Sequence, residues 1–154
     1  MLIWRLKLTT ALLISGCCLF FDRLFKNSAL IGLFSPPLNL VKDFFRLNLA
    51  ENYYLAFSLP FFSAVIPWLI TAILAGLIFY LVYALKKNNY AAAGWLLLII
   101  SGAASNLWDR FRFGYVIDYF DLKYFTVFNL ADVMIVAGVA GFILLTISVN
   151  KKTA

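Results

Sequence analysis

The stretch FFSAVIPWLITAILAGLIFYLVYAL, residues 61–85, contains no charged side chain and ends at Lys86-Lys87. A helix that crosses a bilayer needs about 20 mostly apolar residues. Because backbone polar groups in hydrocarbon must be satisfied within their own segment, such a run is expected to be helical. Residues 61–85 therefore predict a membrane-spanning helix.

Three further apolar runs lie on either side of this stretch. Hydrophobic residues make up 64% of the 154 residues and charged residues only 13%, whereas soluble domains are roughly 45–50% apolar and about 25% charged. We expect one all-α transmembrane domain, residues 1–154, with a small periplasmic β-type cradle and an interfacial segment. The predicted helices are at about 6–24, 61–85, 90–108 and 128–149, and the outer segments at about 25–60 and 109–127.

Basic residues predict the orientation. Pairs of Lys or Arg lie near the amino terminus, at 86–87 and at 151–152, each beside a helix end. Cytoplasmic loops are enriched in these residues, so we expect both termini and the 86–89 connection to be cytoplasmic. In the first outer segment, Ser35-Pro36-Pro37 indicates a turn. The loose alternation at 44–49 and 53–57 then suits short strands or an interfacial segment.

Composition excludes several kinds of chemistry. The chain has no histidine, which excludes Ser-His-Asp and Cys-His catalysis and histidine-ligated metal sites. Cys17 and Cys18 are adjacent in an apolar run and do not form a disulfide framework. The net charge is +6, but no basic stripe with interleaved aromatic residues predicts a nucleic-acid site. Acid–base chemistry must draw mainly on the seven acidic residues, Asp22, Asp43, Glu51, Asp109, Asp118, Asp121 and Asp132.

Polar side chains at membrane depth are costly and are functional candidates. Here they all map to the outer ends of the predicted helices. Asp132 lies about one turn into the fourth helix, where it either complements the helix dipole or serves as a catalytic acid. The apolar neighbours of Asp118 indicate a position at the interface. If these two carboxylates meet, one retains a proton, and the pair can activate water without a metal.

The other charged residues allow two interpretations each. Asp22 and Lys26 have the spacing of a helical ion pair, and a structural role is favoured over a functional one. Asp109 and Arg110 form adjacent opposite charges at a helix end. Such a pair commonly anchors a helix to lipid headgroups, although the planar guanidinium of Arg110 is equally suited to bind substrate.

Four sequence blocks together resemble the bacterial lipoprotein signal peptidase family, also called signal peptidase II. Gly102–Asp118, GAASNLWDRFRFGYVID, is similar to the family pattern G-A-x-x-N-L-x-D-R-x-x-x-G-x-V-x-D. The other three blocks are DRLFK at 22–26, NYYLAF at 52–57 and FNLAD at 128–132. Their order relative to the four predicted spans covers nearly the whole chain. Tyr54 and Ser105 stand where the family often has glycine.

The resemblance implies an aspartic endopeptidase that uses no metal or other cofactor. It assigns the catalytic pair to Asp118 and Asp132. By the same correspondence, Asn52, Asn106, Arg110 and Asn129 contact substrate or orient that pair, and Asp22, Lys26 and Asp109 support the site. The implied substrates are diacylglyceryl-modified prolipoproteins, cleaved just before the modified cysteine near the outer leaflet of the bacterial cytoplasmic (inner) membrane. Membrane lipids and the family's cyclic peptide antibiotic inhibitors are the other implied partners, with no nucleic acid.

Two rival hypotheses remain. Ile14-Ser15-Gly16-Cys17 fits a lipobox, which would make the chain itself a lipoprotein substrate behind a charged n-region and a short apolar h-region. This reading does not explain the three downstream spans. The second rival is a small transporter or a complex subunit, whose polar residues would extend across the bilayer. Their clustering on one side disfavours it.

Overall fold

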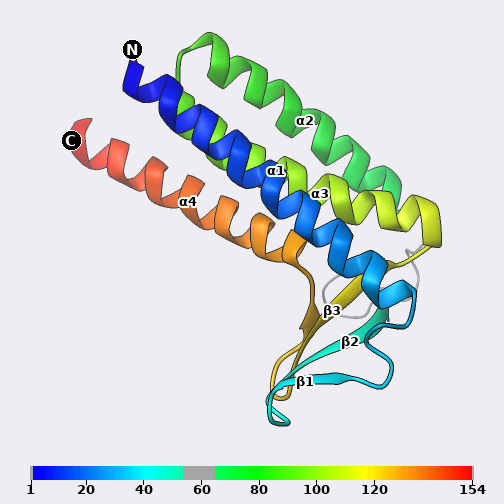
Figure 1. Ribbon diagram of the computed structural model, residues 1–154. Helices are drawn as coiled ribbons and strands as arrows, with labels where there is room; N and C mark the ends of the chain where they lie inside the picture. The colour runs from blue at the N-terminus through cyan, green and yellow to red at the C-terminus, as the bar shows by residue number, and fades with distance from the viewer. Residues whose placement is uncertain (1, 54–64, 154) are drawn as a thin grey trace.

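The computed structural model describes residues 2–53 and 65–153. Its helices are α1 (Leu2–Leu30), α2 (Ile66–Lys86), α3 (Tyr90–Phe113) and α4 (Leu130–Thr153). Within the described residues, each of these four helices contains a stretch long and apolar enough to cross a membrane. They lie side by side with a small sheet at one end of the bundle (Figure 1). The predicted fold class, four transmembrane helices with a small sheet, is confirmed.

Several helix boundaries differ from the prediction, including the start of α2 at Ile66 instead of 61, and three of them lie next to the sheet. Helix α1 continues to Leu30 instead of ending near 24, because Asp22 and Lys26 pair one turn apart inside the helix and do not terminate it. Helix α3 continues to Phe113, where Gly114 adopts the left-handed conformation (φ +83°) and donates its N–H to the Arg110 carbonyl. Helix α4 begins at Leu130, since residues 127–128 pair as a strand.

The sheet is antiparallel, with the order β1 (Leu38–Val41), β2 (Phe45–Asn52), β3 (Val116–Leu122) and β4 (Val127–Phe128). The strand expected at 44–49 overlaps β2, which begins at Phe45. The strand expected at 53–57 lies outside the described residues, apart from Tyr53. Strands β3 and β4 come from the second outer segment, for which no strand was predicted. Because β3 pairs with β2, the sheet joins the two outer segments.

Strand β3 connects the sheet to α1. Alternate residues of a strand face opposite sides, and Ile117 and Tyr119 pack in a buried cluster with Ala29 at the end of α1. The Tyr119 ring stacks on that of Phe25, with 5.3 Å between ring centroids. The intervening residue, Asp118, must therefore point to the other face. The packing of β3 on α1 thus determines the direction of this carboxylate.

Helices α3 and α4 approach closely near the start of α4. A Cβ added to Gly102 would lie 2.9 Å from Ile135 Cγ1 and would also collide with the Ala131 carbonyl oxygen. Further along, a Cβ at Gly141 would lie 2.5 Å from the Trp95 ring. Small residues at these two points let the helix backbones approach each other. The first contact places the opening turn of α4 beside the polar end of α3.

Both chain termini and the short α2–α3 connection lie at the end of the bundle opposite the sheet (Figure 1). This arrangement follows from an even number of antiparallel spans. The sheet and the adjoining ends of the helices therefore occupy one side of the molecule.

Candidate active site

A hydrogen-bonded cluster of amides and carboxylates lies where β2, β3, α3 and α4 converge. Both oxygens of Asp118 accept side-chain amides: Asn129 Nδ2 donates to Oδ1 at 2.6 Å, and Asn52 Nδ2 donates to Oδ2 at 2.9 Å. Asn52 is the last residue of β2 and Asn129 directly precedes α4. Residues at the end of β2 and just before α4 therefore position the Asp118 carboxylate.

Asp132 is held by a second set of donors. Asn106 Nδ2 donates to Asp132 Oδ1 at 2.7 Å, and the backbone N–H of Asn129 donates to Oδ2 at 3.2 Å. In return, the Asp132 N–H donates to Asn129 Oδ1 at 2.9 Å. Asn129 therefore contacts both aspartates: its side-chain nitrogen binds Asp118, and its oxygen and backbone bind Asp132.

Asp118 is 1% exposed, and its pKa is raised above the ordinary value of a carboxyl group. Burial in a poorly solvated site and the neighbouring charge of Asp132 together raise its pKa to about 7, against the opposing effect of the Asn52 and Asn129 amides. Near neutral pH this carboxyl group therefore carries a proton for a substantial fraction of the time. The arrangement can supply both a proton donor and a proton acceptor, as the sequence suggested for two carboxylates that meet.

An ionic cluster lies behind this pair, centred on Lys26. Its ammonium group is 3.0 Å from Asp22 and 2.7 Å from Asp109, and it donates to Asn106 Oδ1 at 2.9 Å. Lys26 is 1% exposed and both aspartates are 0% exposed. The ion pair that the sequence spacing indicated is therefore present. Through Asn106 the cluster also fixes the amide that faces Asp132.

Arg23 belongs to the same cluster and was missed in the sequence. Its Nη1 donates to Asp109 at 2.7 Å, and its Nη2 donates to Ser105 Oγ at 2.7 Å. Ser105 donates in turn to Asp22. Ser105, which stands where the family often has glycine, thus takes part in the polar cluster. The adjacency of Arg23 to Asp22 was the available signal, but it does not reveal the contact with Asp109.

Tyr119 is the second missed residue. Its hydroxyl donates to Asp22 Oδ1 at 3.1 Å and accepts the Leu130 N–H at 3.0 Å, while the Ala131 N–H donates to the same Asp22 oxygen at 3.2 Å. Burial and the charge of Asp22 raise the pKa of Tyr119. Residues of α1 and β3 thereby satisfy the first N–H groups of α4, which have no partner within that helix.

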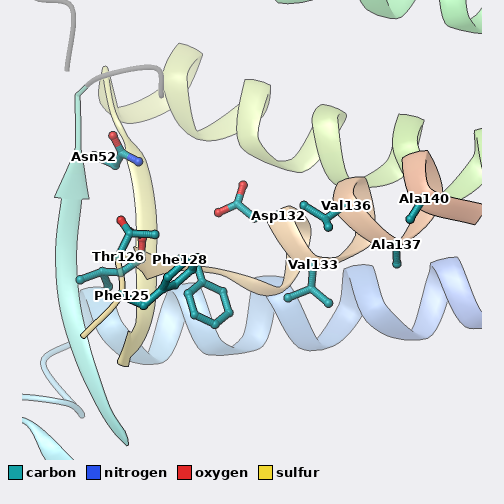
Figure 2. A pocket seen from close by; sticks show the side chains of 10 residues that line it. Asn52, Phe125, Thr126, Phe128, Asp132, Val133, Val136, Ala137 and Ala140 are labelled. Carbon is teal, nitrogen blue, oxygen red and sulfur yellow. The ribbon is translucent and has the colours of Figure 1, made fainter. Parts of the chain in front are cut away.

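Two cavities meet at Asn52 and Asp132. One has a volume of about 590 Å³ and runs from the β3–β4 turn along α4. Figure 2 shows Asn52 and Asp132 toward one end of it and Val136, Ala137 and Ala140 farther along the helix. The other, about 330 Å³, lies between α2, α3 and α4, and Arg110 and Asn106 line it together with Asp132. A substrate in either cavity would contact the carboxylate of Asp132.

The described residues include every candidate residue of the sequence analysis. Tyr54, which departs from the family pattern, lies outside them. Asn52, Asn106, Asp118, Asn129 and Asp132 form one hydrogen-bonded cluster, and Arg110 lines a cavity beside it. Within residues 2–53 and 65–153, no group of three His, Cys, Asp or Glu side chains is placed to hold a metal ion. Ile14–Cys17, the lipobox match, lies inside helix α1.

Fold and site together define a multi-pass membrane protein in which a buried carboxylate, Asp118, and a half-buried one, Asp132, share an asparagine at one end of the helical bundle. A sequence model described as signal peptidase (SPase) II matches residues 14–148. The chain belongs to the signal peptidase II family, and it is therefore a protease.

Individual relatives agree with this assignment, and a solved structure shares the fold. The lipoprotein signal peptidase of Caldanaerobacter subterraneus subsp. tengcongensis is 36% identical over 135 residues, covering 83% of this chain and 89% of the relative. That of Caldicellulosiruptor bescii is 34% identical over 131 residues, covering 85% and 84%. A bacterial membrane enzyme solved by the in meso method at 2.3 Å resolution has a similar fold, with a TM-score of 0.71 at 23% identity, over 95% of this chain and 90% of that one.

Proposed function

We propose that this protein is a membrane-embedded aspartic endopeptidase that cleaves prolipoproteins just before their diacylglyceryl-modified cysteine. The observation that carries the proposal is that Asn129 contacts both Asp118 and Asp132. This contact holds the buried Asp118 carboxylate next to Asp132, which lines two cavities. The names of the relatives, lipoprotein signal peptidases, support the substrate class.

In the proposed mechanism Asp118 is the acid and Asp132 the base. Asp132 takes a proton from a water molecule, whose oxygen attacks the carbonyl carbon of the scissile peptide bond. Asp118 donates its proton to the carbonyl oxygen. When the tetrahedral intermediate collapses, the C–N bond breaks, the leaving amine takes the proton held by Asp132, and the new hydroxyl returns a proton to Asp118. Protons are conserved through the cycle, and no metal or other cofactor takes part.

The surrounding residues take supporting roles in this proposal. Asn52 and Asn129 orient Asp118, and Asn106 orients Asp132. Arg110 binds the substrate from the cavity that it lines. The buried cluster of Asp22, Lys26 and Asp109 holds α1 against α3 and keeps these amides in place.

The proposed location is the bacterial cytoplasmic (inner) membrane, with both termini cytoplasmic and the site near the outer leaflet. Paired basic residues near the termini and in the α2–α3 connection support this orientation. The polar cluster joins β2 and β3 to α3 and the start of α4. The sheet lies at the end of the bundle opposite the termini (Figure 1), where the lipid-modified cysteine of a precursor would lie. Membrane lipids and cyclic peptide antibiotics that inhibit the family are the further proposed partners.

The test uses Asp118→Asn and Asp132→Asn, assayed in detergent with a lipid-modified precursor peptide. Each variant should lose about 10²–10⁴-fold in kcat, because positioned proton transfer contributes that much. Asp43→Asn is the matched control, since Asp43 lies exposed in the turn between β1 and β2, and it should cleave normally. Near-normal turnover by either folded active-site variant would reject the mechanism.

A further inference from the structure

The smaller of the two cavities has aliphatic walls and one polar end. Four residues of α2 line it, Ile70, Ile73, Leu74 and Leu77. On α3 its lining residues are Ile99, Ala103, Asn106 and Arg110, which recur every three or four residues along one helix face. From Ile99 to Arg110 this face extends about 16 Å at 1.5 Å per residue. The cavity is therefore long and apolar, and it opens beside Asp132.

The volume of this cavity limits what it can hold. The cavity holds about 330 Å³, against about 590 Å³ for the other cavity. The smaller volume suits a slim extended acyl chain better than a peptide segment with its side chains. The other cavity, about 590 Å³, lies along the face of α4 formed by Val133, Val136, Ala137 and Ala140.

The proposed substrate requires two routes into the bilayer from one scissile bond. On the amino side of that bond lies the apolar signal segment, and on its carboxyl side lies the cysteine with its acyl chains. Both are hydrophobic and must remain in hydrocarbon while the bond lies between the two aspartates. Both cavities are lined by Asn52 and Asp132 and extend from them between different elements. This arrangement provides one route for each part of the substrate.

We propose that the cavity between α2, α3 and α4 binds one acyl chain of the substrate's lipid-modified cysteine, and that the groove along α4 receives the signal segment. Arg110, at the polar end, is placed to donate hydrogen bonds to the ester carbonyls that join the acyl chains to glycerol. The second acyl chain remains in the bilayer. This inference rests on the proposed function and adds to it the residues that select the lipid.

The experiment compares two precursor peptides that differ only in acyl length, one with long and one with short diacylglyceryl chains. Ala103→Leu fills the cavity from α3 and should raise KM for the long-chain peptide at least about tenfold, since burying each methylene contributes about 0.8 kcal/mol. The short-chain peptide should be cleaved with nearly unchanged kcat and KM. Ala104→Leu makes the same substitution one residue further along, at an exposed position, and should leave both substrates unaffected.

A second variant acts in the opposite direction and avoids a packing clash. Ile73 is 54% exposed and lines the cavity, so Ile73→Ala enlarges it and should shift the preference toward longer acyl chains. The assignment is overturned if both Ala103→Leu and Ile73→Ala affect long and short chains equally or not at all. If Ala137→Leu, in the α4 groove, produces the dependence on acyl length instead, the acyl chain binds in that groove and the assignment of the two cavities is wrong. Failure of the wild type to cleave either peptide would instead reject the proposed function.

Discussion

Asn129 and Asp132 hydrogen-bond each other in both directions across the first turn of α4. The Asp132 N–H donates to Asn129 Oδ1 at 2.9 Å, and the Asn129 N–H donates to the Asp132 carboxylate at 3.2 Å. This is the reciprocal geometry of a capping box, with aspartate as the acidic residue. The carboxylate proposed as the catalytic base therefore also closes the start of its own helix, so the helix backbone sets its position.

This double role predicts that stability and activity can be separated at Asn129. Asn129→Ser keeps a side-chain oxygen for the helix start but removes the amide that donates to Asp118. Both Asn129→Ser and Asn129→Ala remove the donor to Asp118 and the Ile117 carbonyl, so both should lose stability. Asn129→Ala should lose about 1 kcal/mol more, because it also removes the cap. Both should lose at least about tenfold in kcat, which corresponds to about 1.4 kcal/mol of transition-state stabilisation. Normal cleavage by the serine variant would show that the amide is not needed.

The titration of Asp118 predicts a pH dependence of activity and of stability. With a pKa of about 7, the proposed acid loses its proton as pH rises through 7, so kcat/KM should fall about tenfold per unit above that pH. The pKa is raised from 3.8, the ordinary value. The stabilising contribution of the protonated group is therefore lost between about pH 4 and 7, and thermal stability should decline over that range. Asp118→Asn should flatten this decline, and a kcat/KM that stays constant from pH 6 to 9 would contradict the assignment.

Lys26 predicts a large loss of stability when its charge is removed. Its ammonium group is buried between Asp22 and Asp109, and removing one partner of a buried ionic cluster leaves uncompensated charge, which costs about 3–5 kcal/mol. Lys26→Met should therefore unfold at a much lower temperature in detergent. Lys123→Met changes an exposed lysine in the turn after β3 and should lie within about 0.5 kcal/mol of wild type. Similar stability of the two variants would mean that the buried cluster contributes little.

Much of the architecture was predictable because lipid imposes strict rules on the backbone. The apolar run at 61–85 leaves almost no alternative to a helix, and polar residues grouped at the outer helix ends indicated where the site lies. The pairing of Asp22 with Lys26 followed from helical spacing alone. These inferences depend on local periodicity, which the sequence contains.

Contacts between distant segments were not predictable in the same way. Arg23 reaches Asp109 across 86 positions in the sequence, and Tyr119 reaches Asp22 across 97. Both depend on how α1 packs against α3 and β3. Strand β3 was missed because it pairs with β2 from the other outer segment, although Tyr115, Ile117 and Tyr119 alternate with more varied residues. The register between two segments, unlike a helical period, cannot be obtained from either segment alone.

The close approach of α3 to α4 gives the last prediction, which links packing to the position of Asp132. A Cβ at Gly102 would collide with the Ala131 carbonyl, one residue before Asp132. Gly102→Ala must therefore push the first turn of α4 away from α3 and should lengthen the contact between Asn106 and Asp132. Overpacking of this kind costs about 1–3 kcal/mol, and kcat should fall as the carboxylate moves. Gly16→Ala is the matched control, because a Cβ there has no atom within 4 Å, and glycine-to-alanine within a helix stabilises by roughly 0.5–1 kcal/mol. Thermal unfolding and peptide cleavage are measured on both variants. Equal stability and equal kcat of the two variants would mean that the contact between α3 and α4 does not position Asp132.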